Sequence, residues 1–99
     1  MTIQELQQWV RDDWEKYPKN KPTSEQQILF LLEEMGELAE AIRKDKGNKD
    51  RINKETSIGA EMADLLISMI TLANTYEINI TNEIGEFKSR LASRQKQGY

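Results

Sequence analysis

The chain has 99 residues, the length of one ordinary domain, with 31% charged and 37% hydrophobic residues. Its net charge of -3 excludes a broad basic surface, so we expect no nucleic-acid partner. Cysteine and histidine are both absent, which excludes disulfides, thiolate or imidazole metal ligands and a Ser-His-Asp triad. Any metal must therefore be held by oxygen atoms, which favours hard cations such as Mg²⁺, Mn²⁺ or Ca²⁺.

The chain carries no apolar run near the roughly 20 residues that a membrane-spanning helix needs. Its first residues do not resemble a signal peptide. We therefore expect a cytoplasmic protein without a membrane partner. Because no internal repeat is visible, residues 1–99 are interpreted as a single domain.

The first predicted helix runs from Thr2 to about Tyr17. Thr2 and Glu5 have the spacing of a capping box, in which each residue's side chain bonds the other's backbone. Its apolar residues follow helical spacing, at Ile3, Leu6, Val10 and Trp14. The segment YPKNKP, residues 17–22, contains both prolines of the chain and ends this helix.

The second predicted helix begins at Thr23 or Ser24 and ends near Lys46. Thr23 and Gln26 again have capping-box spacing. We expect its core face to consist of Ile28, Leu31, Leu32, Met35, Leu38, Ala39 and Ile42. Residues 47–53 are predicted to form the loop that follows.

The third predicted helix runs from about Lys54 to Tyr76 and is apolar on nearly every side. A single polar stripe interrupts it, at Glu61, Asp64, Ser68, Thr71 and Thr75. A chain of four helices offers too little surface to bury so apolar a helix. We therefore expect a homo-oligomer whose core contains this helix.

The fourth predicted helix begins near Thr81 or Asn82, as its N-cap, and carries Ile84, Phe87 and Leu91 toward a basic tail. No segment shows the alternating pattern of a strand. The predicted fold class is therefore all-α.

Two acidic pairs share a spacing that suggests a common site. Glu34 and Glu37 are three residues apart, as are Glu61 and Asp64, so each pair lies on one helix face. An antiparallel hairpin centred on Lys49 places Glu34 level with Asp64 and Glu37 level with Glu61. Four carboxylates then converge, with a repulsion of about 4 kcal/mol per pair at 4 Å and an effective dielectric of ~20.

A divalent cation would neutralise such a cluster, and Mg²⁺ suits ligands that are all oxygen. The alternative is a solvated acidic face, with surface pairs such as Glu37 with Arg43 and Glu40 with Lys44. A di-iron bundle is excluded because its Glu-x-x-His pairs need histidine.

The motif EEMGE, residues 33–37, followed by EMAD, residues 61–64, resembles the EExxE…ExxD signature of MazG-like nucleoside triphosphate pyrophosphohydrolases. The resemblance spans about residues 23–94. It implies a four- or five-helix protomer completed by homodimerisation, sometimes as a tetramer. It also implies Mg²⁺-dependent hydrolysis of a (d)NTP to the (d)NMP and pyrophosphate in a house-cleaning role, with Mn²⁺ as a substitute.

Carried over residue by residue, the resemblance implies Glu34, Glu37, Glu61 and Asp64 as metal ligands. Glu33 matches the first glutamate of the signature, and we interpret Glu33 and Glu34 as the catalytic carboxylates. Some members of the family that this chain resembles carry a tyrosine one turn after the last acidic residue, where this chain has Ser68.

Basic residues are the candidates for binding the phosphates of the substrate. Lys88 falls near a basic position of the family's fourth helix, Arg90 and Arg94 are its neighbours, and Lys54 is a further candidate. The alternative for the first three is a solvated basic helix.

Trp9 and Trp14 are the obvious stacking surfaces for a base, and Trp9 is retained as a candidate. The alternative for both tryptophans is core or interface packing.

Other functions fit the same residues. The substrate could be phosphoribosyl-ATP or dUTP, with the same chemistry at phosphorus. A third hypothesis is a non-catalytic helical dimer that binds a partner through its acidic groove.

Overall fold

The computed structural model describes residues 1–45 and 57–98. Its elements are helix α1 (Ile3–Lys16), the 3₁₀ turn η1 (Pro18–Asn20) and helices α2 (Ser24–Asp45), α3 (Ile58–Thr75) and α4 (Ile80–Lys96). Within the described ranges there is no strand, so the prediction of an all-α fold is confirmed. The predicted loop 47–53 and Lys54 lie outside these ranges.

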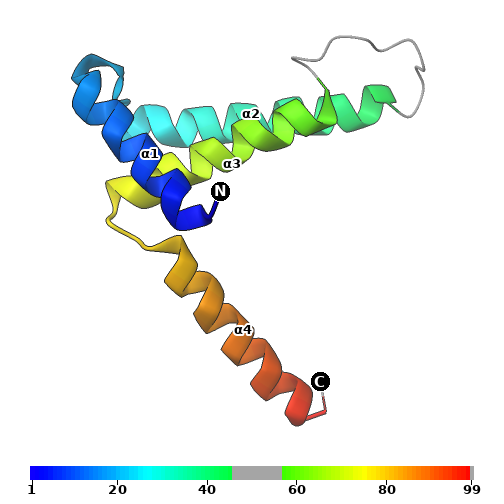
Figure 1. The fold of residues 1–99 in the computed structure, drawn as a ribbon. Helices are drawn as coiled ribbons and strands as arrows, with labels where there is room; N and C mark the ends of the chain where they lie inside the picture. The colour runs from blue at the N-terminus through cyan, green and yellow to red at the C-terminus, as the bar shows by residue number, and fades with distance from the viewer. Residues whose placement is uncertain (46–56, 99) are drawn as a thin grey trace.

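Helices α2 and α3 form an antiparallel hairpin, which is the most extensive packing in the chain (Figure 1). Helix α1 crosses the end of this hairpin, and α4 leaves it as a projecting arm. The Cα radius of gyration is 16.8 Å, whereas a compact chain of this length has about 13 Å. One chain therefore does not enclose a globular core around α4.

Local capping explains where the first two helices begin. Thr2 Oγ1 accepts from the Glu5 N–H at 3.0 Å, and the Thr2 N–H donates to Glu5 Oε1 at 3.1 Å. Thr23 and Gln26 form the same reciprocal pair at 3.2 and 2.9 Å. Both predicted capping boxes are confirmed.

The predicted start of the fourth helix is wrong by two to three residues. The N-cap is Asn79, whose Oδ1 accepts from the Asn82 N–H at 3.1 Å. Asn82, predicted as a possible cap, is therefore the residue that is capped. The sequence alone predicts a cap at Thr81 or Asn82, whereas tertiary contacts at Ile80 accompany a start at Asn79.

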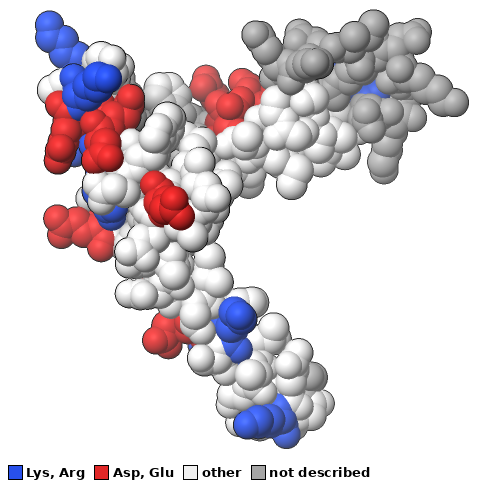
Figure 2. All heavy atoms as spheres, viewed as in Figure 1, with Lys and Arg blue, Asp and Glu red and all other residues white. Residues whose placement is uncertain are grey.

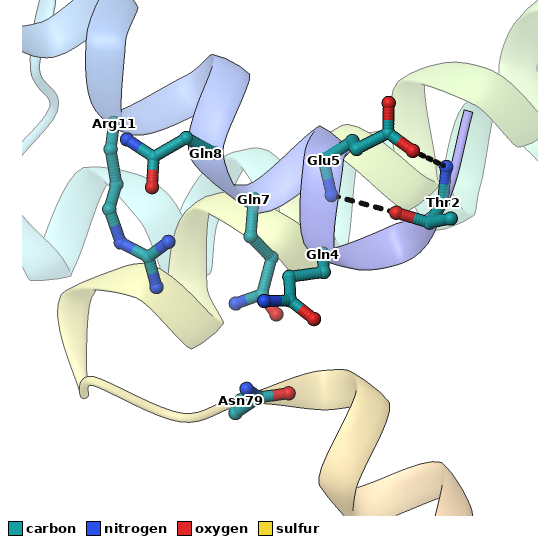
Figure 3. Close-up of a pocket in the computed structure, with 7 residues that line it drawn as sticks. All are labelled: Thr2, Gln4, Glu5, Gln7, Gln8, Arg11 and Asn79. Atoms are coloured by element: carbon teal, nitrogen blue, oxygen red, sulfur yellow. Dashed lines mark hydrogen bonds between the residues drawn. The ribbon is translucent and has the colours of Figure 1, made fainter.

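Those contacts come from Gln7, a buried amide of α1 that is 2% exposed. Its Nε2 donates to Asn74 Oδ1 at 2.9 Å and to the Ile78 carbonyl at 2.8 Å, while its Oε1 accepts from the Ile80 N–H at 3.0 Å. Asn74 Nδ2 donates back to the Gln7 carbonyl at 3.0 Å. Figure 3 shows Gln7 pointing from α1 toward Asn79. This network ties α1 to the corner between α3 and α4 and sets where the arm begins.

The predicted core face of α2 needs a correction within one chain. Four of its residues are between 42 and 61% exposed, namely Ile28, Leu32, Met35 and Ile42. The less exposed face keeps the predicted Leu31 and Leu38 and otherwise consists of Gln27, Glu34 and Ala41, each one residue before a predicted core position. The chain therefore buries a partly polar face and leaves its most apolar stripe exposed.

Candidate metal centre

Three carboxylates meet between α2 and α3. Glu34 comes from α2, and Glu61 and Asp64 come from successive turns of α3. One oxygen of each lies within 4.8 Å of the other two. Glu61 is buried at 4% exposure, Glu34 is half-buried and Asp64 is exposed, so the cluster opens to solvent on one side. The hairpin thus joins two acidic pairs that are far apart in sequence.

The electrostatics of Glu34 are unfavourable without a cation. Burial raises the pKa of the Glu34 carboxyl above its ordinary value, and the charges of Glu37, Asp64, Glu61 and Glu33 raise it further, in that order. Glu34 Oε2 is buried and accepts no hydrogen bond from any described residue. Neither Glu34 nor Asp64 forms an ion pair with a described lysine or arginine. Buried polar atoms normally have a hydrogen-bond partner, and the described residues supply none for this oxygen.

These residues fit a hard divalent cation. The donors are carboxylate oxygens only, which are the ligands that Mg²⁺ and Mn²⁺ prefer. An ion beside Glu34 Oε2 would satisfy that atom and offset the mutual repulsion of the cluster. Since Asp64 is exposed, the site is open to solvent on its side.

Glu37 and Glu33 lie beside the cluster rather than within it. Both are exposed, and neither belongs to the group of three whose oxygens converge. The charge of Glu37 nevertheless raises the pKa of Glu34 more than any other neighbouring carboxylate does. Of the four carboxylates, Glu33 raises that pKa least. The hairpin therefore brings three of the four predicted ligands together, with Glu37 as an exposed neighbour one turn along α2.

Glu40 shows what an ordinary surface glutamate does in this helix. Arg43 Nε donates to Glu40 Oε2 at 3.0 Å, and Lys44 Nζ lies 3.7 Å from Glu40 Oε1. The Arg43 guanidinium holds the pKa of Glu40 below its ordinary value. The alternative of surface ion pairs on this helix therefore holds for Glu40. Glu37 forms no ion pair with a described residue.

The predicted substrate-binding residues are not at the cluster within one chain. Lys88, Arg90 and Arg94 are exposed on α4, which packs on α1 and points away from the α2–α3 hairpin (Figures 1 and 2). Trp9 is 59% exposed on α1. Lys54 lies outside the described residues.

A cavity of about 240 Å³ is lined by residues of α1, η1, α2 and α3. Its lining includes Trp14, Phe30, Gln27 and Ser68. Sequence reasoning singled out Trp14 as a possible stacking surface and Ser68 as the position of the family's tyrosine, and it missed Phe30 and Gln27. The available signal was spacing, because Phe30 precedes Glu34 by one helical turn, but this spacing is also that of ordinary core residues.

Residues 22–99 match the MazG nucleotide pyrophosphohydrolase domain. The chain belongs to this family. The matched range holds both acidic pairs of the candidate metal centre, so the resemblance seen in EEMGE and EMAD is confirmed. No helix in the described part of this MazG chain is both long and apolar enough to cross a bilayer.

Two crystal structures of iMazG from Vibrio DAT 722 share the fold. Each superposes with a TM-score of 0.68, at 29% and 31% sequence identity. The alignments cover 96% and 94% of this chain and 97% and 99% of the iMazG chains. The uncharacterized protein YvdC of Bacillus subtilis (strain 168) is 26% identical over 95% of this chain and 96% of its own length. This MazG chain therefore matches its relatives over nearly their whole length.

Proposed function

We propose that the protein is a Mg²⁺-dependent pyrophosphohydrolase that converts a (d)NTP to the (d)NMP and pyrophosphate. The observation that carries the proposal is the convergence of Glu34, Glu61 and Asp64, with Glu34 Oε2 buried and lacking a hydrogen bond within the described residues. Membership of the MazG family supplies the reaction class. The proposed role is house-cleaning of standard or modified nucleotides by a single domain, residues 1–99, in the cytoplasm.

Glu34, Glu61 and Asp64 would hold the ion, with Glu37 completing the set from its exposed position. Bound Mg²⁺, or Mn²⁺ as a substitute, would neutralise triphosphate charge and orient the reacting groups. In the hydrolysis, a water oxygen bonds to the α-phosphorus, and the bond from that phosphorus to the bridging oxygen of the β-phosphate breaks. We assign Glu33, or Glu34 itself, to accept the proton that the water loses.

The phosphates also need cations from the protein. Lys88, Arg90 and Arg94 are the proposed contacts, together with Lys54 and with Trp9 as a candidate near the base. Within one chain α4 carries its cations away from the carboxylates. The proposal therefore includes a homo-oligomer, a dimer or a tetramer.

The apolar surface of the chain supports this oligomer. Exposed stripes run along three helices, at Ile28, Leu32, Met35 and Ile42 of α2, Met62, Leu66 and Met69 of α3, and Ile84, Phe87 and Leu91 of α4. Large exposed apolar side chains in such number are typical of helices that pack against a partner. Covering it with a second copy would bury the helices that one chain leaves exposed.

Product analysis tests the proposal. Purified protein and Mg²⁺ would be incubated with each standard (d)NTP, including dUTP, and with phosphoribosyl-ATP, and products resolved by ³¹P NMR. The proposal expects equal amounts of the monophosphate and pyrophosphate from at least one substrate, and none after addition of EDTA. Release of orthophosphate and a diphosphate would refute attack at the α-phosphorus. No turnover of any substrate would favour the non-catalytic dimer with an acidic groove.

A further inference from the structure

A polar cavity lies between α1 and the connection from α3 to α4, and it shares no lining residue with the candidate metal centre (Figure 3). Its volume of about 340 Å³ is at the lower end of the ~300–1,000 Å³ typical of small-molecule sites. Every described residue that lines it is polar or charged. The cavity therefore suits a small polar ligand without an aromatic ring.

One stripe of α1 forms the main wall of the cavity. Residues three and four apart share a helix face, and along α1 these are Gln4, Gln7, Gln8 and Arg11. A helix face that turns toward the rest of its chain is normally apolar. Figure 3 shows Gln4, Gln7 and Arg11 pointing from this face toward the side where α3 continues into α4. The sequence thus places amides and a guanidinium at the root of the α4 arm.

The fold engages only some of the polar groups around the cavity. Both amide N–H groups of Gln7 donate within the network that holds α4. The Gln4 side chain, in contrast, forms no hydrogen bond with a described residue. Asn79 Oδ1 accepts from the Asn82 N–H, but the Asn79 side-chain N–H groups donate to no described residue. Two side chains therefore bring unused donors to the cavity.

Arg11 adds a cation that has no counter-ion in the described part of the chain. Its side chain is half-buried, and its guanidinium forms no ion pair or hydrogen bond with a described residue. Glu15, four residues further along α1, has the spacing for a pair but does not form one. The Glu5 carboxylate accepts from the Thr2 N–H and points away from Arg11 (Figure 3). A partly buried cation of this kind favours an anionic ligand, which a guanidinium can bind through two parallel hydrogen bonds.

We propose that this cavity binds a small organic anion. Arg11 holds its carboxylate or phosphate group, and Gln4 and Asn79 donate hydrogen bonds to the rest of the molecule. Because Asn79 is the N-cap of α4, the ligand joins α1 to the arm and stabilises the position of the arm. The site does not depend on the proposed hydrolase activity, since it uses none of the cluster carboxylates.

Two-dimensional ¹H–¹⁵N NMR of the full chain can locate this ligand. Titrations in EDTA prevent binding of phosphate through a metal ion. The probes are malate and ribose 5-phosphate, which represent the carboxylate and phosphate sources, with inorganic phosphate and neutral ribose for comparison. We expect saturable shifts of backbone amides in residues 4–11 and 78–82 with malate or ribose 5-phosphate, weaker binding of inorganic phosphate and no shifts with ribose.

Substitution of Arg11 supplies the second measurement. Arg11→Gln should raise the apparent Kd of the bound probe by at least about 10-fold, because the hydrogen bonds between the guanidinium and the anion are lost. Arg11→Lys should have a smaller effect, since it keeps the charge but not the planar fork. Lys16→Gln removes the same charge from α1 outside the cavity and should leave the Kd unchanged. Thermal melts would verify that the three variants fold.

Several outcomes would overturn the proposal. These are the absence of a saturable shift with both organic anions, shifts centred on the carboxylate cluster or the end of α4, and an unchanged Kd in Arg11→Gln. Equal affinity for inorganic phosphate would also overturn it, because Gln4 and Asn79 would then contribute nothing. Product analysis of the hydrolase is independent of these titrations, so either proposal can fail while the other stands.

Discussion

The Glu34 side chain combines the two properties that point most strongly to a metal ligand, a raised pKa and a buried oxygen without a hydrogen bond from any described residue. It occupies the α2 face that turns toward α3, where an aliphatic residue would pack at no electrostatic cost. Instead, burial and four neighbouring carboxylates raise its pKa, and its Oε2 is buried without a hydrogen bond from any described residue. A fold retains such a group when a ligand compensates for it, and the compensation expected here is a divalent cation.

Replacing the Glu34 carboxylate with a neutral amide should therefore raise the stability of the metal-free protein and lower its activity. Glu34→Gln should raise the Tm measured in EDTA, because it relieves repulsion, and should abolish the Tm increase caused by Mg²⁺. Turnover should fall by at least about 10²-fold, the upper range for disturbing the surroundings of a metal ligand. Glu40→Gln is the matched control, since Glu40 is an exposed residue paired with Arg43 and Lys44. A Glu34→Gln variant that keeps both turnover and the Mg²⁺ shift would contradict the assignment.

The raised pKa of Glu34 also predicts a pH dependence for the metal-free fold. The folded state binds a proton more readily than the unfolded state, whose pKa stays near 4.5. This contribution to stability is therefore complete below pH 4.5 and is lost as pH rises through the folded pKa. In EDTA, the Tm should rise as the pH is lowered from neutral toward 4.5.

Two controls isolate the residue responsible. In the same buffers, the Tm of the Glu34→Gln variant should rise less than that of the wild type as the pH is lowered. Glu40 cannot produce it, because its lowered pKa contributes stability that is lost only as pH falls below 4.5. Since Mg²⁺ binds the carboxylate form, its stabilising effect should shrink over the same range. An identical pH profile in wild type and Glu34→Gln would exclude Glu34 as the source.

At the scale of elements, local rules predicted the helices well. Capping boxes at Thr2 and Thr23 and the two prolines placed the first two helices within about one residue of where they lie. The start of α4 was wrong because its N-cap depends on Gln7, which is more than 70 residues away in sequence. Periodicity placed Leu31 and Leu38 of α2 correctly but also assigned Ile28, Leu32, Met35 and Ile42 to the core, and one chain leaves these four exposed.

The Gln7 network predicts a large stability effect from one amide. Gln7→Ala removes three hydrogen bonds. Asn74 Oδ1, the Ile78 carbonyl and the Ile80 N–H each lose the partner that the Gln7 amide supplies. The free energy of unfolding should fall by about 2–4 kcal/mol, measured by urea denaturation. Gln8→Ala, which loses only an exposed bond to Asp12, should change it by less than about 0.5 kcal/mol. Equal effects of the two substitutions would show that the network does not hold α4.

At the scale of the whole molecule, the chain resembles part of a larger assembly. Its radius of gyration exceeds that of a compact chain, and apolar stripes on α2, α3 and α4 face outward. From the sequence, the apolar character of α3 led us to expect a homo-oligomer, and this stays a prediction. The sequence could not predict which residues meet across an interface, because periodicity describes a helix face and not the surface that covers it. For the same reason it could not place Lys88, Arg90 and Arg94 relative to the carboxylates.

Light scattering coupled to gel filtration tests the assembly. The wild type should elute at a multiple of the 11.5 kDa of one chain. Leu32→Glu, which places a charge in the exposed stripe of α2, should shift it toward the monomer and remove activity if α4 cations come from a second copy. Ser24→Glu adds the same charge to the first turn of α2, outside the stripe, and should leave the mass unchanged. A monomeric wild type would refute the oligomer.

Glu34, Glu61 and Asp64 are proposed to form one cation site, on which the proposed activity depends most. Calorimetric titration of Mn²⁺ into metal-free protein measures this directly, without a substrate and without knowledge of the oligomer. Wild type should bind Mn²⁺ saturably, and Asp64→Asn and Glu61→Gln should each weaken that binding by at least about 10-fold, with Glu40→Gln unchanged. Equal Mn²⁺ affinity in wild type and in both cluster variants would contradict the account.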